Sequence, residues 1–366
     1  MKFEIEREEF LKPLQAVIGV VERRQTMPVL ANILLIAEGD TIALTATDLE
    51  VELAARAEAN IIEPGRITIP AHKLMDIVRN LPTAVRVQVS VKDNRAFVVA
   101  ARSRFTLSTL PANDFPEVEA IDEGQSFSLK QTDFRNLIVK THFSMALQDV
   151  RYYLNGLLLE IQADTVRTVA TDGHRLAIAE INSESAIEGE CQVIVPRKGI
   201  QELQRLLSDA DDQVQIELGG NHIRVSLPET RFTSKLIDGR FPDYQRVIPA
   251  NADKIMEVDS ETLRQALVRV SILSNEKYRG VQFEIDSHEL KIQSNNPEQD
   301  EAEEELAATF NHEPIKIGFN ATYLLDVINA IDEETLELAF VDANSSCLIR
   351  GKDNNNCRYV VMPMRL

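Results

Sequence analysis

The stretch IPAHKLMDIVRNLPT at residues 69–83 decides the fold, because the chain contains related copies of it at two later places. The copies are VPRKGIQELQRLLSD at residues 195–209 and GFNATYLLDVINAID at residues 318–332. Each predicts a short strand, a turn and then a helix with apolar residues on one stripe. Three colinear copies of one pattern indicate a chain built from repeated domains.

The segments that flank this stretch repeat in the same order. Arg104, Arg231 and Arg358 are equally spaced, and each precedes an aromatic residue in a strand-forming run. The dipeptide Thr-Asp at residues 47–48 likewise recurs at residues 171–172. Solenoids and propellers repeat every 20–50 residues or so, and the period here is much longer. The repeating unit is therefore a whole domain.

We expect three similar domains, at residues 1–124, 125–252 and 253–366. Within each repeat the order is a helix, strands of alternating polarity, a second helix and further strands. This order predicts an α+β fold in three tandem copies, each with two helices packed on antiparallel sheet.

The charge is unevenly distributed along the chain. The net charge is −19, whereas proteins that bind phosphate usually carry a positive balance. The six expected helices are together mildly basic, so the strands and loops carry the negative balance. If the helices share one face, that face could still meet DNA, because salt screens charges beyond about 8–10 Å. Ordinary helix composition is the alternative, since Lys and Arg favour helices.

The remaining bulk features favour a cytoplasmic protein. The three cysteines have no metal-ligand spacing, and their odd number argues against a disulfide framework. The N-terminus lacks the apolar run of a signal peptide, and no apolar run reaches the length of a membrane span. We therefore expect no membrane association.

Motifs that carry catalysis are missing from the sequence. It contains no glycine-rich phosphate loop, no nucleophile elbow and no cluster of metal ligands. His174 lies in TDGHR, where the Asp-Gly pair predicts a turn and no nucleophile precedes it. We expect a non-catalytic protein without cofactor or metal; an enzyme of unknown class on a triplicated domain is the alternative.

Opposite charges near the two ends of the chain suggest that copies associate head to tail. Arg102 and Arg104 accompany apolar Phe105 in the first repeat, and the third repeat contains the acidic run PEQDEAEEE. Such heterologous contacts form rings when the rotation closes. A solvated acidic loop is the alternative.

Several long segments together resemble one known family. They include QDVRYYLNG, VATDGHRLA, TSKLIDGRFPDY, NNPEQDEAEE and the terminal YVVMPMRL, and the resemblance covers essentially the whole chain. The sequence resembles the beta subunit of bacterial DNA polymerase III, the sliding clamp. The resemblance implies a head-to-tail homodimer, a ring of six domains around double-stranded DNA. It also implies sequence-independent tethering of the replicative polymerase, with the clamp loader and other clamp-binding proteins as partners. A ring-forming scaffold without DNA loading is the alternative function.

The resemblance also implies three groups of site residues. A hydrophobic cleft between the second and third domains would bind short peptides of partner proteins through Arg151, Leu154, Thr171, Gly173, His174, Arg175, Leu176, Pro242, Arg246, Val247, Asn320, Tyr323, Val360, Val361, Met362, Pro363, Met364, Arg365 and Leu366. DNA would be contacted by Arg24, Lys73, Gln148, Tyr152, Tyr153 and Lys198. The ring interface would place Arg102, Arg104, Phe105 and Leu107 of one subunit against Ile272, Leu273, Glu301 and Glu304 of the other.

One position departs from the family pattern. His72 stands where a second basic residue beside Lys73 is expected. A neutral histidine there would weaken one phosphate contact and leave the class of protein unchanged.

Overall fold

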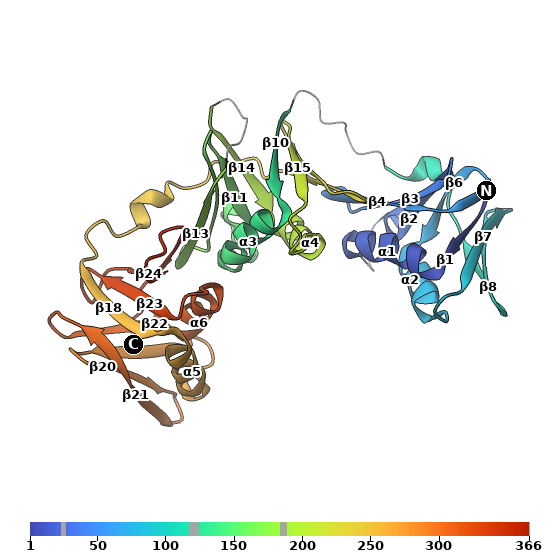
Figure 1. The fold of residues 1–366 in the computed structure, drawn as a ribbon. Helices are drawn as coiled ribbons and strands as arrows, with labels where there is room; N and C mark the ends of the chain where they lie inside the picture. Colours follow the sequence, from blue (N-terminus) through green and yellow to red (C-terminus); the bar gives the residue numbers. More distant parts are fainter. Residues whose placement is uncertain (23–26, 117–123, 184–188, 366) are drawn as a thin grey trace. The chain divides into compact units, whose positions relative to one another are not determined.

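The computed structural model describes residues 1–22, 27–116, 124–183 and 189–365 (Figure 1). Their contacts group them into two compact units. Unit 1 comprises Met1–Thr132 and Gln201–Leu236, and unit 2 comprises Asp133–Ile200 and Ile237–Leu366. The middle repeat therefore contributes strands to both units, and the exact boundaries between the three domains stay a prediction.

Unit 1 contains two antiparallel sheets. The first has the strand order β5 (Asn60–Glu63), β1 (Lys2–Glu6), β7 (Arg86–Lys92), β8 (Arg95–Ala100), β9 (Ser103–Ser108). The second has the order β10 (Gln125–Lys130), β15 (Gln213–Leu218), β16 (His222–Ser226), β17 (Thr230–Lys235), β4 (Val51–Glu58), β3 (Thr41–Thr47), β2 (Asn32–Glu38), β6 (Gly65–Pro70).

Unit 2 contains one long antiparallel sheet. Its order is β14 (Cys191–Pro196), β11 (Gly156–Ile161), β12 (Thr165–Thr171), β13 (Arg175–Asn182), β25 (Cys357–Val361), β24 (Cys347–Gly351), β23 (Thr335–Phe340), β18 (Lys254–Asp259), β21 (Glu301–Phe310), β20 (Glu289–Asn295), β19 (Gly280–Ile285), β22 (Ile315–Asn320).

Each repeat supplies two helices, as the sequence predicts. The pairs are α1 (Arg7–Val17) with α2 (Ala71–Asn80), α3 (Gln131–Thr141) with α4 (Arg197–Leu206), and α5 (Ser260–Val270) with α6 (Ala321–Ala330). In unit 1, α1 contacts α2 and packs on β3 and β4. In unit 2, α5 contacts α6 and packs on β20 and β21 (Figure 1).

Apolar stripes on these helices form the cores. In α1 the stripe is Phe10, Leu14 and Val17, all fully buried. Each such side chain stabilises the fold by about 1.5–3 kcal/mol relative to an exposed one. The helix ends at Val17, earlier than the sequence pattern suggests, because the β-branched and glycine run that follows disfavours helix. Val21 is still buried, after a short 3₁₀ turn.

Two equivalent strand pairs join successive repeats. In unit 1, β4 of the first repeat pairs with β17 of the second, and Glu52 lies opposite Thr233. In unit 2, β13 of the second repeat pairs with β25 of the third, and Leu176 lies opposite Val360. The internal repeat thus extends to the register of the strands that link the domains.

Candidate functional site

Arg175, the first residue of β13, is the centre of the candidate cleft in unit 2. Its Nε donates to Oδ2 of Asp172 at 3.1 Å, and its Nη2 donates to the carbonyl oxygen of Phe143 at 2.7 Å. Nη1 donates to Oδ2 of Asp326 on α6 at 2.5 Å. Three segments that are distant in the sequence are therefore fixed around one guanidinium group.

An aromatic platform lies beside this guanidinium group. The Arg175 Cζ atom is 4.5 Å from the ring centroid of Tyr323. The His174 ring stacks on the Tyr323 ring, with 6.5 Å between the ring centroids and an interplanar angle of 23°. Burial raises the pKa of Tyr323, and Asp172 raises it further, so the phenol stays neutral. Asn320 caps α6 by accepting from the backbone N–H groups of Thr322 and Tyr323, which fixes the ring's position.

The predicted Asp-Gly turn precedes Arg175. Oδ1 of Asp172 accepts from the N–H groups of His174 at 2.9 Å and Arg175 at 3.0 Å. Gly173 has φ +88°, and a Cβ there would lie 2.9 Å from Nη2 of Arg151. His174 is exposed and belongs to this turn, and no cluster of three or more metal-binding side chains occurs in the described part of the chain.

A buried apolar cluster is the expected floor of the cleft. It contains Leu158, Val169, Leu176, Ile178, Ile194, Phe241, Tyr244 and Val360, and Tyr153 and Ile248 pack against it. The expected cleft residues Leu154, Leu176, Val360 and Val361 are almost fully buried. Val247 and Met362 are 38% and 39% exposed, and Pro242 is also exposed, so these expected cleft residues offer apolar surface.

The C-terminal tail runs along the same region. The N–H of Met362 donates to the carbonyl oxygen of His174, and that of Met364 donates to Gly318, both at 2.9 Å. Pro363 and Met364 are half-buried and Arg365 is exposed. Leu366, also expected in the cleft, lies outside the described residues.

Two basic residues of the expected cleft are tied to neighbouring acids. Arg151 pairs with Asp149 at 2.9 Å and lowers the pKa of that carboxyl group to about 2. Arg246 pairs with Asp243 at 2.8 Å, and both side chains are exposed. The expected cleft therefore combines a buried apolar cluster with paired charges.

Sequence reasoning missed a buried polar network beneath the cleft. Oε2 of Glu160 accepts from Nη1 of Arg167 and from the hydroxyl of Tyr244, both at 2.7 Å. Burial raises the pKa of Glu160, but these hydrogen bonds outweigh it and the net direction is downward. A charged residue inside the apolar strand pattern GLLLEI was the available signal. Phe143 and Asp326, which hold Arg175, carried no comparable signal.

The expected DNA-contacting residues lie in both units. Lys73 is exposed on α2 in unit 1, where the neighbouring His72 places Nε2 3.0 Å from the carbonyl oxygen of Val21. In unit 2, Tyr152 is 56% exposed and Tyr153 is half-buried, with their ring centroids 5.7 Å apart. Gln148 is exposed and Lys198 is half-buried. Arg24 lies outside the described residues.

The expected interface residues lie on strand edges and in turns. Arg102 is exposed in the turn before β9; on β9 itself Arg104 is exposed, Phe105 is half-buried and Leu107 belongs to the core. Ile272 is 71% exposed in the turn after α5, and Leu273 beside it is half-buried.

The two acidic residues expected at the interface lie on β21. Glu301 is exposed, whereas Glu304 is half-buried. Glu304 already accepts from Arg269 of its own chain at 2.7 Å.

Comparisons with known proteins agree with this architecture. Models of the N-terminal, central and C-terminal domains of the DNA polymerase III beta subunit match residues 1–119, 128–243 and 245–365. The beta sliding clamp of Pseudomonas aeruginosa is 54% identical, and that of Escherichia coli K12 is 48% identical, each over the full length of both chains. The crystal structure of the Pseudomonas aeruginosa subunit superposes with a TM-score of 0.97 over 100% of both chains. A griselimycin-bound clamp from Bartonella birtlesii, 42% identical, also gives 0.97 over 100% of both chains.

Three tandem helix-on-sheet domains, joined by continuous strand pairing, define the class of DNA clamps. Within that class, the chain belongs to the DNA polymerase III beta subunit family, whose members are named beta sliding clamps. No helix among the described residues has the length and apolarity needed to cross a bilayer.

Proposed function

We propose that this protein is the processivity clamp of a replicative DNA polymerase. It encircles duplex DNA as a ring and tethers the polymerase without itself catalysing a reaction, and it works in the cytoplasm. The full-length match to beta sliding clamps carries this proposal. A scaffold without DNA loading is not favoured, because nothing in the match points to one.

DNA contact in this proposal is to the phosphate backbone and is weak. The mildly basic helices carry Lys73 and Lys198, and Arg24, Gln148, Tyr152 and Tyr153 complete the proposed set. Backbone contacts carry no sequence information, so the ring is free to move along the duplex. Retention then comes from topology, which lets a chain of net charge −19 stay on DNA.

The cleft around Arg175 is the proposed docking site for partner proteins, including the clamp loader. Its apolar floor and the exposed Val247 and Met362 suit short peptides with apolar side chains. Methionine surfaces repack around different ligands, so several partners can use one site.

Ring closure in this proposal follows from the repeat. The first repeat pairs with the second through β4 and β17, and the second pairs with the third through β13 and β25. By the same pattern, the third repeat would pair its β21 with β9 in the first repeat of a second copy. In the described residues β9 lies at the edge of its sheet, and Glu301–Ala307 of β21 pairs only with β20. The expected contacts place Arg102, Arg104, Phe105 and Leu107 against Ile272, Leu273, Glu301 and Glu304 of the other copy.

Loading on circular DNA tests the function. The protein is loaded on nicked circular DNA with a clamp loader, and the DNA is then linearised. We expect the protein to stay on circles and to leave linear DNA by its ends, whereas blocking both ends should retain it. A protein that remains on open linear DNA would be an ordinary DNA binder, and one that never loads would be a scaffold; either result contradicts the proposal.

A further inference from the structure

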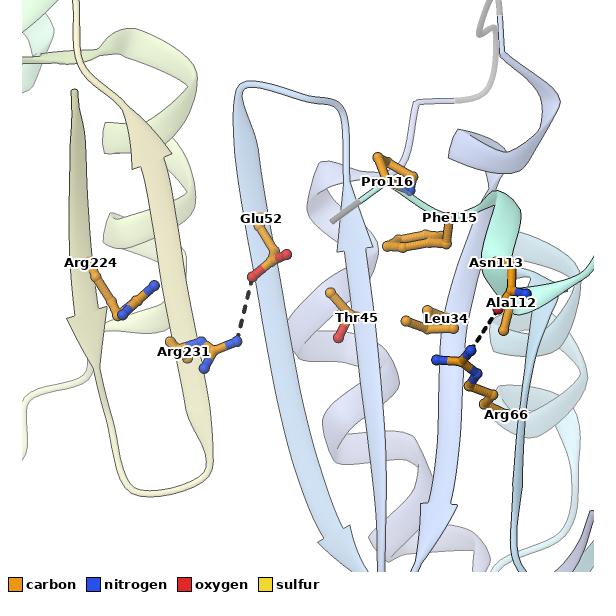
Figure 2. Close-up of a pocket in the computed structure, with 10 residues that line it drawn as sticks. All are labelled: Leu34, Thr45, Glu52, Arg66, Ala112, Asn113, Phe115, Pro116, Arg224 and Arg231. Atoms are coloured by element: carbon orange, nitrogen blue, oxygen red, sulfur yellow. Dashed lines mark hydrogen bonds and ion pairs between the residues drawn. The ribbon is translucent and has the colours of Figure 1, made fainter. Parts of the chain in front are cut away.

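A pocket in unit 1 lies where the first two repeats meet. It has a volume of about 610 Å³ and is lined by Leu34, Thr45, Glu52, Arg66, Ala112, Asn113, Phe115, Pro116, Arg224 and Arg231 (Figure 2). All of these residues belong to unit 1. A volume of this size is typical of sites for small ligands or a few peptide side chains.

The pocket occupies the repeat position of the peptide cleft. Glu52 opposite Thr233 corresponds to Leu176 opposite Val360 in the equivalent strand pair. Phe115, which packs with Leu34, corresponds to Phe241 of the cleft floor. The same backbone arrangement therefore occurs twice in one chain, with different side chains.

The chemistry of the two places differs sharply. The pocket has Glu52 at the repeat position where the cleft floor has Leu176. It has Arg224 at the repeat position of Leu348, which packs on that floor. Arg231 and Arg66 add two more guanidinium groups to the lining. Three cations and one carboxylate give a local positive balance in a chain of net charge −19.

The arginines on one side of the pocket are incompletely satisfied. Nη2 of Arg231 is 3.6 Å from Oε1 of Glu52, and Nη1 of Arg224 is 3.4 Å from Oε2 of Glu217. The Nε of Arg224 and the hydroxyl of Thr233 are buried without a hydrogen-bond partner among the described residues. Buried donors without acceptors are costly, so an anion between Arg224 and Arg231 would be stabilised.

The other side of the pocket combines the apolar Leu34 and Phe115 with Arg66 and Asn113, which are hydrogen-bonded to each other. Figure 2 shows Leu34 and Phe115 across Glu52 from Arg224 and Arg231. The loop that carries Phe115 is held at its other end, because Arg66 donates to Asn113 at 2.6 Å. An anionic group and an apolar group of the same ligand can therefore be accommodated together.

We propose that this pocket is a second peptide site, which takes an acidic side chain between Arg224 and Arg231 and an adjacent apolar side chain against Leu34 and Phe115. The choice of a peptide over a free anion rests on the proposed function of the equivalent cleft. The acidic side chain of such a peptide is a carboxylate, so the proposal takes a carboxylate, and not a phosphate group, as the anion between the two arginines.

Glu52 couples the site to pH. Burial raises the pKa of Glu52, and Arg231 and Arg224 offset this only in part. The groups that face it are Arg231 on β17 and Arg224 on β16, with Glu217 on β15 paired to Arg224. A bound carboxylate raises this pKa further, so binding should take up a proton and strengthen as the pH falls, as long as the ligand stays ionised.

The test uses the full-length protein and a labelled, acetylated and amidated tetrapeptide, Leu-Glu-Phe-Glu, followed by fluorescence anisotropy at low salt. We expect Arg224→Gln with Arg231→Gln to weaken binding about tenfold or more, and Glu52→Gln to strengthen it and remove its pH dependence. The matched peptide Leu-Gln-Phe-Gln should bind poorly. Arg231→Lys serves as a second variant that keeps the charge if the double variant fails to fold.

Three outcomes would overturn the proposal. Equal binding by the wild-type protein and the double arginine variant removes the site. Loss of binding in Tyr323→Ala instead places the peptide in the cleft of unit 2. If inorganic phosphate displaces the labelled peptide as effectively as unlabelled peptide does, the pocket is a general anion site. The DNA-loading assay is independent of all three, so a failure here leaves the proposed clamp function standing.

Discussion

At the scale of single residues, the internal repeat is reproduced hydrogen bond by hydrogen bond. Oγ1 of Thr47 donates to the carbonyl oxygen of Val51 at 2.9 Å, and Oγ1 of Thr171 donates to that of Arg175 at 2.6 Å. Asp48 and Asp172 accept from equivalent backbone N–H groups. One turn is thus built twice, because a Thr-Asp pair can satisfy the same backbone groups in either domain.

The turn requires a left-handed residue, and the two copies meet this requirement differently. Gly173 has φ +88° and Leu49 has φ +79°. A left-handed conformation costs an L-residue about 1–2 kcal/mol and costs glycine little. The sequence predicts the turn at Asp-Gly, but no local signal predicts it at Leu49.

Substitution of Gly173 tests this account. We expect Gly173→Ala to lower the free energy of unfolding by about 1–2 kcal/mol, measured by urea denaturation, because alanine is strained at this φ. The Arg151 guanidinium, the nearest group to the new Cβ, ends a flexible side chain and can move at little cost. Gly39→Ala is the control, because Gly39 has φ +64° and an added Cβ would meet nothing within 4 Å. Backbone strain alone should therefore lower its free energy of unfolding by a similar amount. Unchanged stability of both variants would contradict the strain argument.

At the scale of elements, the proposed cleft depends on where α6 begins relative to β13. The Asn320 cap fixes the first turn of α6, which places Tyr323 beside Arg175. Asp326, one turn later, reaches the same guanidinium group. Each element is predictable from its own sequence, whereas their meeting is not, because these side chains are more than a hundred residues apart.

We expect Tyr323→Ala to weaken binding of a labelled peptide rich in Leu and Phe about tenfold, because the aromatic platform and its cation–π contact are lost. Tyr323→Phe keeps the ring and should bind nearly as well as the wild-type protein. Fluorescence anisotropy measures both affinities. An equal loss in the two variants would mean that the hydroxyl group, and not the ring, makes the contact.

At the scale of the whole molecule, the proposed assembly depends on pairing β21 of one copy with β9 of another. Exposed ion pairs contribute only about 0–1 kcal/mol each, so apolar contacts should provide most of the stability of the interface. Ile272 is 71% exposed within one chain, although large apolar side chains are usually buried. This exposure fits a residue that becomes covered by a second copy.

We expect Ile272→Ala with Leu273→Ala to convert the protein to monomers in sedimentation velocity at micromolar concentration. Val150→Ala is the matched control, because Val150 is 95% exposed and lies outside the proposed interface. It should sediment as the wild-type protein does, which we expect to be a dimer. A double variant that remains dimeric would refute this placement of the interface.

The sequence by itself determined the threefold repeat, the two helices of each copy, the Asp-Gly turn and the family. These features are local patterns or long colinear matches, and both can be read along the chain. Only the tertiary structure decided which residues hold Arg175, that Val360 and Val361 are buried, and that Arg224 and Arg231 lie near Glu52 where the first two repeats meet. Those arrangements depend on strand register between distant segments, and no local pattern specifies a pairing across the fold.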